Sequence, residues 1–486
     1  MKRLAFMIFV FTLVFISCNN EKAGDISTEI YTVENGLLPA IFVKDDSLTK
    51  FNILERMDHY KVPGVSIAIV ENGEVKWAKG YGIANTESGS IVDTKTIFQA
   101  GSISKPLAAL SALKLVENGN LDLDEDVNTY LTDWKIPESK FTKVEKVTLR
   151  RLLTHTAGMT VHGFPGYQQT DTFPSITQVL NGEGNTPRIY VDTIPGNIWR
   201  YSGGGYTIME KMVEDISGQA LDEYISKNIL QPIGMQHSNY EQPLGAEYYS
   251  NASAAYDSEG NIIEGLWHNY PEQAAAGLWT TPTDLAKYCI EIQNILSGKE
   301  TGILSKKTIN KMLTKHKNNW GLGPSLQWDE DSLIFRHGGK NAGFTNELIS
   351  FANRGNAVIV MTNADNGGKL IGEILRSVSN YYDWGISNPR IVEVINLPIG
   401  NLSNLIGKYK LDFQVPDIGD YIIEITVREN KLFVTDPNNG DTNVLTALEA
   451  LKFIDLEKGD EVLFQVGEEK KGLLWSNRFQ FNKINE

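Results

Sequence analysis

The sequence predicts an α+β fold followed by a small all-β domain. Extended runs occur near both ends of the longer part, at 65–70 and 74–78 and again at 344–351 and 357–362, around a largely helical middle. Strands at both ends of a helical segment indicate one sheet whose first and last strands meet. At 486 residues the chain exceeds what one hydrophobic core usually organises, so a second domain is expected.

Local signals predict the main elements in order. Asn72-Gly73 tolerates positive φ, which is typical of a tight hairpin. A buried helix is expected over 107–116, ended by Gly119. Thr281-Pro282-Thr283-Asp284 predicts a helix start with a cap, a proline at the first position and an acid at the third. A further helix is expected near 369–381.

The pattern changes after Asn388-Pro389 to short alternating runs separated by turn signals. These runs lie at 422–427, 432–435, 462–466 and 473–481. They predict a separate barrel-like or sandwich-like β domain over 400–486, after a main domain over 46–388. The β domain carries no catalytic constellation of its own.

Residues 1–17 have the pattern of an export signal, with two basic residues before an apolar run too short for a comfortable membrane span. Phe15-Ile16-Ser17-Cys18 resembles the processing site of bacterial lipoproteins, which implies cleavage before Cys18 and lipidation of its thiol. An ordinary cleaved signal or an uncleaved anchor is the alternative. Residues 18–45 are then expected to form a tether with a partly ordered end. We therefore expect an exported bacterial lipoprotein of the cell envelope, periplasmic or on the outer-membrane side, attached to the membrane by lipid.

Charge and cysteine content narrow the function classes. The net charge is −15 and no basic cluster offsets it, so nucleic acid is not an expected partner. The chain has two cysteines, Cys18 and Cys289, so no disulfide framework is possible once Cys18 is acylated. The sequence contains no His-Glu-x-x-His motif and no paired Cys-x-x-Cys motifs, which are typical of metal sites. We therefore expect neither a metal nor another cofactor.

The strongest chemical signal is Ser102-Ile103-Ser104-Lys105, which sets a serine one helical turn before a lysine. Residues i and i+3 share a helix face, so a neutral Lys105 could take the proton of Ser102 as its hydroxyl attacks a carbonyl carbon. Gly101 lets the backbone approach closely, and the start of a helix favours the developing negative charge.

The same spacing occurs twice more, so the motif alone is weak. Ser111 and Lys114 lie in the same predicted helix as Ser102, but Ser111 faces about the opposite way. Ser47, paired by spacing with Lys50, is better explained as a helix cap.

Two further segments place glycines beside a polar side chain. Tyr201-Ser202-Gly203 could expose a tyrosine whose pKa is lowered by a nearby lysinium, which would suit a proton shuttle. His337-Gly338-Gly339 could present an imidazole to a substrate. Alone, each has a structural explanation: a tyrosine packed under a turn, and a histidine that only supports the fold.

Taken in order, these three motifs resemble the serine hydrolases of the class C β-lactamase and penicillin-binding protein superfamily. Further stretches are similar to the same family, and the resemblance spans roughly 48–385: Gly80-Tyr81-Gly82, Leu152-Leu153-Thr154-His155-Thr156-Ala157-Gly158, Pro232-Ile233-Gly234-Met235 and Ala276-Gly277-Leu278-Trp279-Thr280-Thr281. The resemblance implies a β-lactamase-like fold, with an antiparallel sheet covered by helices on both faces and a helical subdomain. The site would lie between the sheet and that subdomain.

By position, the resemblance implies that Ser102 is the acylated nucleophile and Lys105 its proton acceptor. Tyr201 would share this proton and pass it to the leaving group, and His337 would orient the substrate or support Tyr201. The backbone N–H groups of Ser102 and Lys340 would form the oxyanion hole. The remaining substrate-binding positions are the motif glycines Gly203, Gly338 and Gly339.

Two departures from the β-lactamase pattern bear on the substrate. Gly203 replaces an asparagine at the end of the second motif, and His337-Gly338-Gly339 replaces Lys-Thr-Gly. Losing the amide and the ammonium favours an esterase, D-amino-acid peptidase or amidase over a true β-lactamase. The expected partner is a small-molecule or peptide substrate, and the oligomeric state stays open. The alternative is a non-catalytic envelope protein that binds or senses cell-wall fragments.

Three other residues or segments have competing interpretations. The resemblance assigns His155 to a structural turn, which makes a direct chemical role for it improbable. The loop of His162 with Phe164-Pro165-Gly166-Tyr167 either lines the pocket or lies at the surface. Trp279 is expected in the core.

Overall fold

The structure, a computed structural model, describes residues 18–299, 302–329, 332–415, 418–437, 440, 442–467 and 471–484. Its main domain is built on one antiparallel sheet, to which the described residues contribute seven strands in the order β4-β3-β2-β10-β9-β8-β7. The strand bounds are β2 Gly64–Glu71, β3 Glu74–Asn85, β4 Ser90–Ile91, β7 Ser325–Asp329, β8 Ser332–Asn341, β9 Phe344–Phe351 and β10 Ala357–Thr362. Strand β2 pairs with β10, which confirms that the first and last parts of the domain meet in one sheet.

Both faces of this sheet are buried. On β2, Ile67 and Ile69 belong to one hydrophobic cluster, whereas Ala68 and Val70 belong to the other. Because successive side chains of a strand point to opposite faces, the alternation separates two cores. Near-continuous apolar strands are what a sheet covered on both sides requires.

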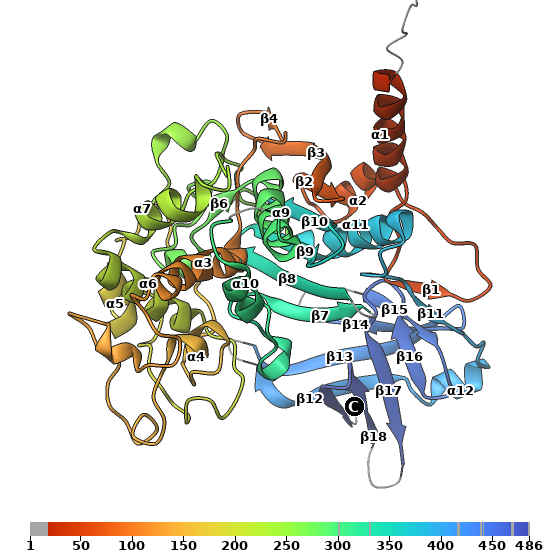
Figure 1. The fold of residues 1–486 in the computed structure, drawn as a ribbon. Coiled ribbons are helices and arrows are strands. Elements are labelled where there is room, and N and C mark those ends of the chain that lie inside the picture. Colours follow the sequence, from red (N-terminus) through yellow and green to blue (C-terminus); the bar gives the residue numbers. More distant parts are fainter. Residues whose placement is uncertain are drawn as a thin grey trace, which may run out of the picture.

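Helices cover these faces and form a separate helical region on the left of Figure 1. Their bounds are α1 Cys18–Glu34, α2 Ile53–His59, α3 Ser104–Glu117, α4 Leu149–Leu153, α5 Ile176–Asn181, α6 Gly203–Ser217, α7 Leu221–Ile225, α8 Gln273–Ala276, α9 Pro282–Ser297, α10 Lys306–Met312, α11 Gly367–Tyr382 and α12 Ile399–Ser403. Side chains of α11 pack in the same cluster as Ile67 and Ile69, whereas α3, α6 and α9 pack in the cluster of Ala68 and Val70. The α+β class with a helical subdomain is therefore confirmed.

Several local signals are confirmed in detail. The turn between β2 and β3 places Asn72 and Gly73 at φ of 56° and 78°. The Thr281 side chain accepts a hydrogen bond from the Asp284 N–H, and Pro282 opens α9. The cap, the proline and the acid therefore act together as their order predicts.

The expectation of a tether over 18–45 is wrong. Helix α1 packs against α11, and Val33 and Leu37 are 2% and 0% exposed in the same cluster as the sheet. Strand β1 (Ile41–Val43) then pairs in parallel with β11 (Arg390–Val392). The segment showed little periodicity because only a few of its side chains reach the core, yet those few are fully buried.

The predicted export signal, residues 1–17, lies outside the described residues. The predicted lipidation site, Cys18, is the first residue of α1. Within the part of the chain that the structure describes, no helix combines the length and apolar character needed to cross a membrane.

The C-terminal domain is a closed β-barrel with its own core, which settles the choice left open between barrel and sandwich. Its strands among the described residues are β12 Gly407–Val415, β13 Gly419–Arg428, β14 Lys431–Thr435, β15 Thr442–Ala447, β16 Lys452–Asp455, β17 Glu461–Val466, β18 Lys471–Trp475 and β19 Phe479–Ile484. The run expected as one strand over 473–481 is two strands, because Ser476 and Asn477 adopt positive φ and turn the chain.

Candidate active site

Ser102 and Lys105 lie where a single-turn 3₁₀ helix, η1 (Gly101–Ile103), runs into α3. Lys105 Nζ is 3.0 Å from Ser102 Oγ and donates a hydrogen bond of 2.7 Å to the carbonyl oxygen of Ala275 in α8. The lysine side chain is buried, and burial lowers its pKa to about 7. At this pKa about half of the lysine side chains are uncharged amines near pH 7, and only the uncharged form can accept the proton of Ser102.

Strand β8 touches the nucleophile loop through two glycines. Gly101 has φ +54°, and a Cβ there would lie 2.6 Å from the amide nitrogen of Lys340. A Cβ at Gly339 would overlap the carbonyl oxygen of Ala100. The close backbone approach brings the Lys340 amide beside Ser102, in keeping with the expected oxyanion hole.

Tyr201 lies beside this pair, but its expected pKa shift is wrong in direction. Burial raises the pKa of the Tyr201 hydroxyl, and its contact with Ser102 offsets only part of that effect. Lys105 Nζ sits 5.0 Å from the centre of the Tyr201 ring. The expectation considered only the charge of Lys105, whereas burial of the Tyr201 hydroxyl itself disfavours the phenolate and is the larger effect.

His337 completes the group on β8 as a neutral imidazole. Its Nδ1 is 2.6 Å from the Gly338 carbonyl oxygen, so Nδ1 carries the proton and donates. Burial, together with the nearby Lys105, lowers the pKa of His337 to about 3. Its Nε2 is a buried lone pair without a hydrogen-bond partner among the described residues, and the Tyr201 and His337 ring centres are 6.2 Å apart. The site therefore has no fixed positive charge at this position.

The His155 ring packs against the Tyr201 ring. Their ring centres are 4.2 Å apart, and His155 Nδ1 accepts a hydrogen bond of 3.1 Å from the Ser202 backbone N–H. Its φ of +57° places it in the turn that the resemblance implied. His155 thus fixes the position of Tyr201 and makes no contact with a reacting atom.

Trp320, which joins these aromatic side chains, was not predicted from the sequence. Its ring centre is 5.0 Å from that of His155, 5.7 Å from Tyr201 and 5.6 Å from His337. Trp320 follows a short turn between α10 and β7, and no motif surrounds it. A lone tryptophan in a connecting segment offered no signal by which it could have been found.

These residues open into a cleft of about 800 Å³. It is lined by Ser102, Lys105, Tyr201, His337, Gly338, Gly339 and Lys340, together with His162, Phe164 and Pro165 of the loop between α4 and α5. The structure thus confirms the pocket-lining alternative for this loop, and Trp279 is fully buried in the core as expected.

Gly203 does not line this cleft, so its expected substrate contact is corrected. It begins α6, where its N–H donates to the His162 carbonyl oxygen at 2.9 Å. A Cβ at this position would lie 2.8 Å from the Phe164 ring. Gly203 therefore holds the loop of His162 and Phe164 in place.

Two ion pairs that involve the cleft residues Glu347 and Lys340 were also not predicted from the sequence. Arg336 donates two hydrogen bonds to one carboxylate oxygen of Glu347, at 3.1 and 2.8 Å, and Lys340 is paired with Asp365 at 3.5 Å. Burial raises the pKa of Glu347, which lies opposite Gly338 in the β8–β9 ladder. The described part of the chain holds no cluster of three or more His, Cys, Asp or Glu side chains suited to a metal.

The fold and the three motifs are matched by a known family over residues 52–376, which is most of the chain. The chain belongs to the beta-lactamase family. “Putative penicillin-binding protein PbpX” of Bacillus subtilis is 28% identical over 311 residues, which cover 62% of this chain and 71% of that protein. “Protein flp” of Staphylococcus aureus (strain MRSA252) is 23% identical over 375 residues, which cover 73% of this chain and 67% of that protein.

Solved structures show the same fold. The octameric penicillin-binding protein homologue from Pyrococcus abyssi has a TM-score of 0.60 and 24% identity, covering 88% of this chain and 98% of that one. SurE with D-Leu has a TM-score of 0.55 and 20% identity, covering 89% and 97%. These likenesses show that the fold of this chain recurs in other proteins.

The contact between β8 and η1 predicts a contrast between two adjacent glycines. Gly339→Ala is expected to lower the free energy of unfolding by about 1–3 kcal/mol, because its methyl group collides with the Ala100 backbone. Gly338→Ala is the matched control, since its Cβ would meet only the end of the Glu347 side chain at 3.0 Å. Urea denaturation measures the free energy of unfolding of both variants. Equal losses of stability in the two variants would contradict the close approach of Gly339 to the Ala100 backbone.

Proposed function

We propose that this protein is a serine hydrolase that cleaves an ester or amide through an acyl-Ser102 intermediate. The observation that carries the proposal is the buried Lys105 amine, 3.0 Å from Ser102 Oγ and with a pKa lowered to about 7. An ordinary lysine ammonium could not accept a proton at neutral pH, whereas this amine can. Membership of the beta-lactamase family supports the same chemistry.

In the proposed acylation step, Ser102 Oγ bonds to the substrate carbonyl carbon while its proton moves to Lys105 Nζ. The carbonyl oxygen becomes an oxyanion, which the N–H groups of Ser102 and Lys340 would stabilise. The bond to the leaving group then breaks, and that group takes the proton back from Lys105 through Tyr201. Water attacks the acyl-enzyme with the same groups as base and acid, which releases the carboxylic acid and restores the Ser102 hydroxyl.

The charges of the cleft favour an ester or neutral amide over a substrate recognised by a carboxylate. His337 is neutral, Arg336 is held by Glu347, and Lys340 is paired with Asp365. At these three positions a carboxylate such as that of a β-lactam therefore meets no cation that lacks a carboxylate partner. One structural neighbour, SurE, has a crystal structure with D-Leu, which supports keeping D-amino-acid peptides among the candidate substrates.

We also propose an exported, lipid-anchored location, which is supported by the sequence of residues 1–18 alone. A Cys18→Ser variant tests it, because loss of the thiol would abolish incorporation of a labelled fatty acid into the protein. A wild-type protein that takes up no label, or a variant that takes up as much as the wild type, would contradict the lipid anchor.

The reactivity of Ser102 separates an enzyme from a silent envelope-binding protein. A fluorophosphonate probe is expected to label the folded protein and the Ser47→Ala control, because Ser47 lies outside the cleft. Ser102→Ala is expected to abolish labelling, since its hydroxyl is the only proposed nucleophile. Mass spectrometry locates the adduct. An unlabelled but folded wild-type protein would favour the binding-protein alternative.

The cleft charges predict a substrate ranking. A short-chain nitrophenyl ester is expected to be turned over faster than a D-alanyl peptide or a chromogenic cephalosporin, because the neutral His337 supplies no cation for a carboxylate at the third motif and Arg336 is paired with Glu347. Values of kcat/KM measured on one preparation give the ranking. A cephalosporin rate far above that of the ester would overturn it.

Lys105 also sets the expected pH dependence of acylation. Below pH about 7 the amine gains a proton, so the rate should fall roughly tenfold per pH unit, and above pH 7 it should level off. Glu272→Gln is the control, because Glu272 is buried before α8 with a pKa raised to about 8 and makes no contact with Ser102. Stopped-flow measurements should give the same dependence of the acylation rate on pH in this variant. If the fall in rate below pH about 7 were absent in Glu272→Gln, the titrating group would be Glu272 and not Lys105.

A further inference from the structure

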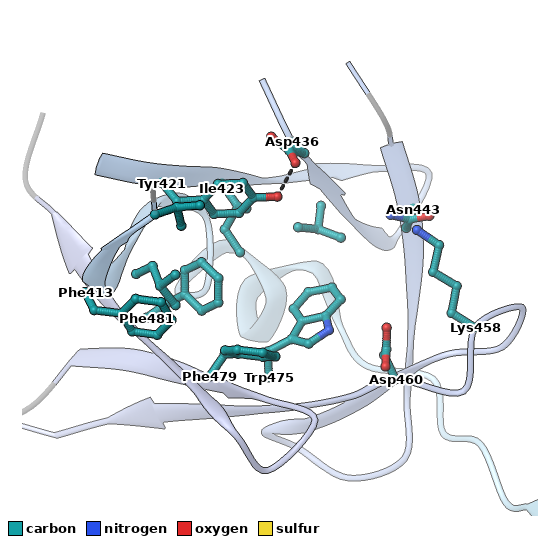
Figure 2. A pocket seen from close by; sticks show the side chains of 13 residues that line it. Phe413, Tyr421, Ile423, Asp436, Asn443, Lys458, Asp460, Trp475, Phe479 and Phe481 are labelled. Atoms are coloured by element: carbon teal, nitrogen blue, oxygen red, sulfur yellow. Dashed lines mark hydrogen bonds between the residues drawn. The ribbon is translucent and has the colours of Figure 1, made fainter. Parts of the chain in front are cut away.

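One end of the C-terminal barrel encloses a cavity of about 530 Å³ that is separate from the Ser102 cleft. Figure 2 shows the rings of Tyr421, Phe481, Phe479 and Trp475 around it. Ligand pockets of drug-sized molecules commonly have volumes of about 300–1,000 Å³ and mostly apolar walls. The cavity therefore has the size and lining of a small-molecule site.

The cavity is a continuation of the barrel interior. Leu411, Ile423 and Val434, which form its deeper wall, are 6%, 4% and 3% exposed and belong to the barrel core. Phe413 lines the same cavity on β12 but is 51% exposed. An apolar ring held at an open cavity stays in contact with water, and a ligand that covers it gains the hydrophobic free energy.

Side chains fill the rest of the barrel interior. Phe453, Phe464 and Leu473 are 1%, 2% and 0% exposed in the same core, and the Phe453 and Phe464 rings pack edge to face at 5.4 Å. The barrel is thus solid over part of its length and hollow at one end. A closed barrel of this strand number has room for one small ligand.

Polar side chains gather on one side of the cavity, where Figure 2 shows Asp436, Asn443, Lys458 and Asp460. Tyr421 donates a hydrogen bond to Asp436, and Ser476 donates one of 2.7 Å to Asp460. Among the described lining residues, two carboxylates face one ammonium, so the negative charge is in excess. A polar end that carries a negative charge is disfavoured here, whereas hydroxyl groups can both donate and accept.

We propose that the barrel binds a single-chain amphiphile, with its alkyl chain among the aromatic rings and an uncharged, hydroxylated end beside Asp436, Asn443 and Asp460. We base this proposal on the arrangement of the lining, in which apolar and polar residues lie on different sides of the same cavity. The site does not depend on Ser102, and it adds a binding function to the domain that has no catalytic constellation.

The test compares two probes with the same chain and different ends, 1-O-dodecylglycerol and dodecanoate, each below its aggregation concentration. The glycerol ether contains no bond that a serine hydrolase cleaves, and the Ser102→Ala protein is expected to bind it as the wild type does. Isothermal titration calorimetry is expected to give a dissociation constant for the ether at least about tenfold below that for dodecanoate. Tighter binding of dodecanoate, or binding of neither probe, would overturn the proposal.

Two adjacent positions on β15 provide matched variants. Asn443 lines the cavity, whereas Val444 is 38% exposed and lies on the other face of the strand. Asn443→Trp is expected to fill the polar side of the cavity and weaken binding of the ether about tenfold or more, while Val444→Trp leaves it unchanged. Thermal unfolding of both variants checks that the barrel is intact. Equal affinity of the two folded variants would place the probe elsewhere, and Ser102 labelling, which both variants should retain, keeps this result separate from the hydrolase proposal.

Discussion

Burial of the Lys105 amine is the constraint on which the rest of the site depends. A lysine outside the protein holds its proton up to about pH 10, whereas burial lowers the pKa of Lys105 to about 7. Between these values the unfolded chain binds one more proton than the folded protein. The free energy of unfolding therefore rises with pH across this window, and below it Lys105 lowers the stability by several kcal/mol. The two hydrophobic cores, one on each face of the sheet, stabilise the fold and so offset the cost of burying the Lys105 amine.

The same burial explains why the other polar groups of the site are neutral. It lowers the pKa of His337 and raises that of Tyr201, so neither of these side chains carries a charge near neutral pH. Their positions come from different parts of the chain: η1 and α3, the segment before α6, and β8. Backbone contact between Gly339 and Ala100 brings β8 to the nucleophile, so the sheet and the helical subdomain meet at the proposed reaction centre.

The sequence predicted what is encoded locally. The β2–β3 hairpin, the capped start of α9 and the spacing of Ser102 and Lys105 each depend on neighbouring residues, and each appears as expected. Contacts between distant segments left no such signal. Helix α1 docks on α11 with few buried residues, and Trp320 reaches His155 and Tyr201 only through the fold. The pKa shift of Tyr201 was predicted in the wrong direction because burial of its own hydroxyl, which a motif cannot reveal, raises the pKa.

The neutral His337 of the third motif affects two properties of the site: the pKa of Lys105 and the recognition of a substrate carboxylate. A second ammonium beside Lys105 would disfavour its protonation further, since like charges repel more strongly away from water. With His337 neutral, burial is the cause that lowers the pKa of Lys105, as the structure indicates. A histidine in place of the lysine removes a cation that could hold a substrate carboxylate, but it leaves the pKa of Lys105, the proposed base, at about 7. In the proposed mechanism, substrate choice can thus change while Ser102 and Lys105 keep their roles, which agrees with the general finding that one fold can serve several functions.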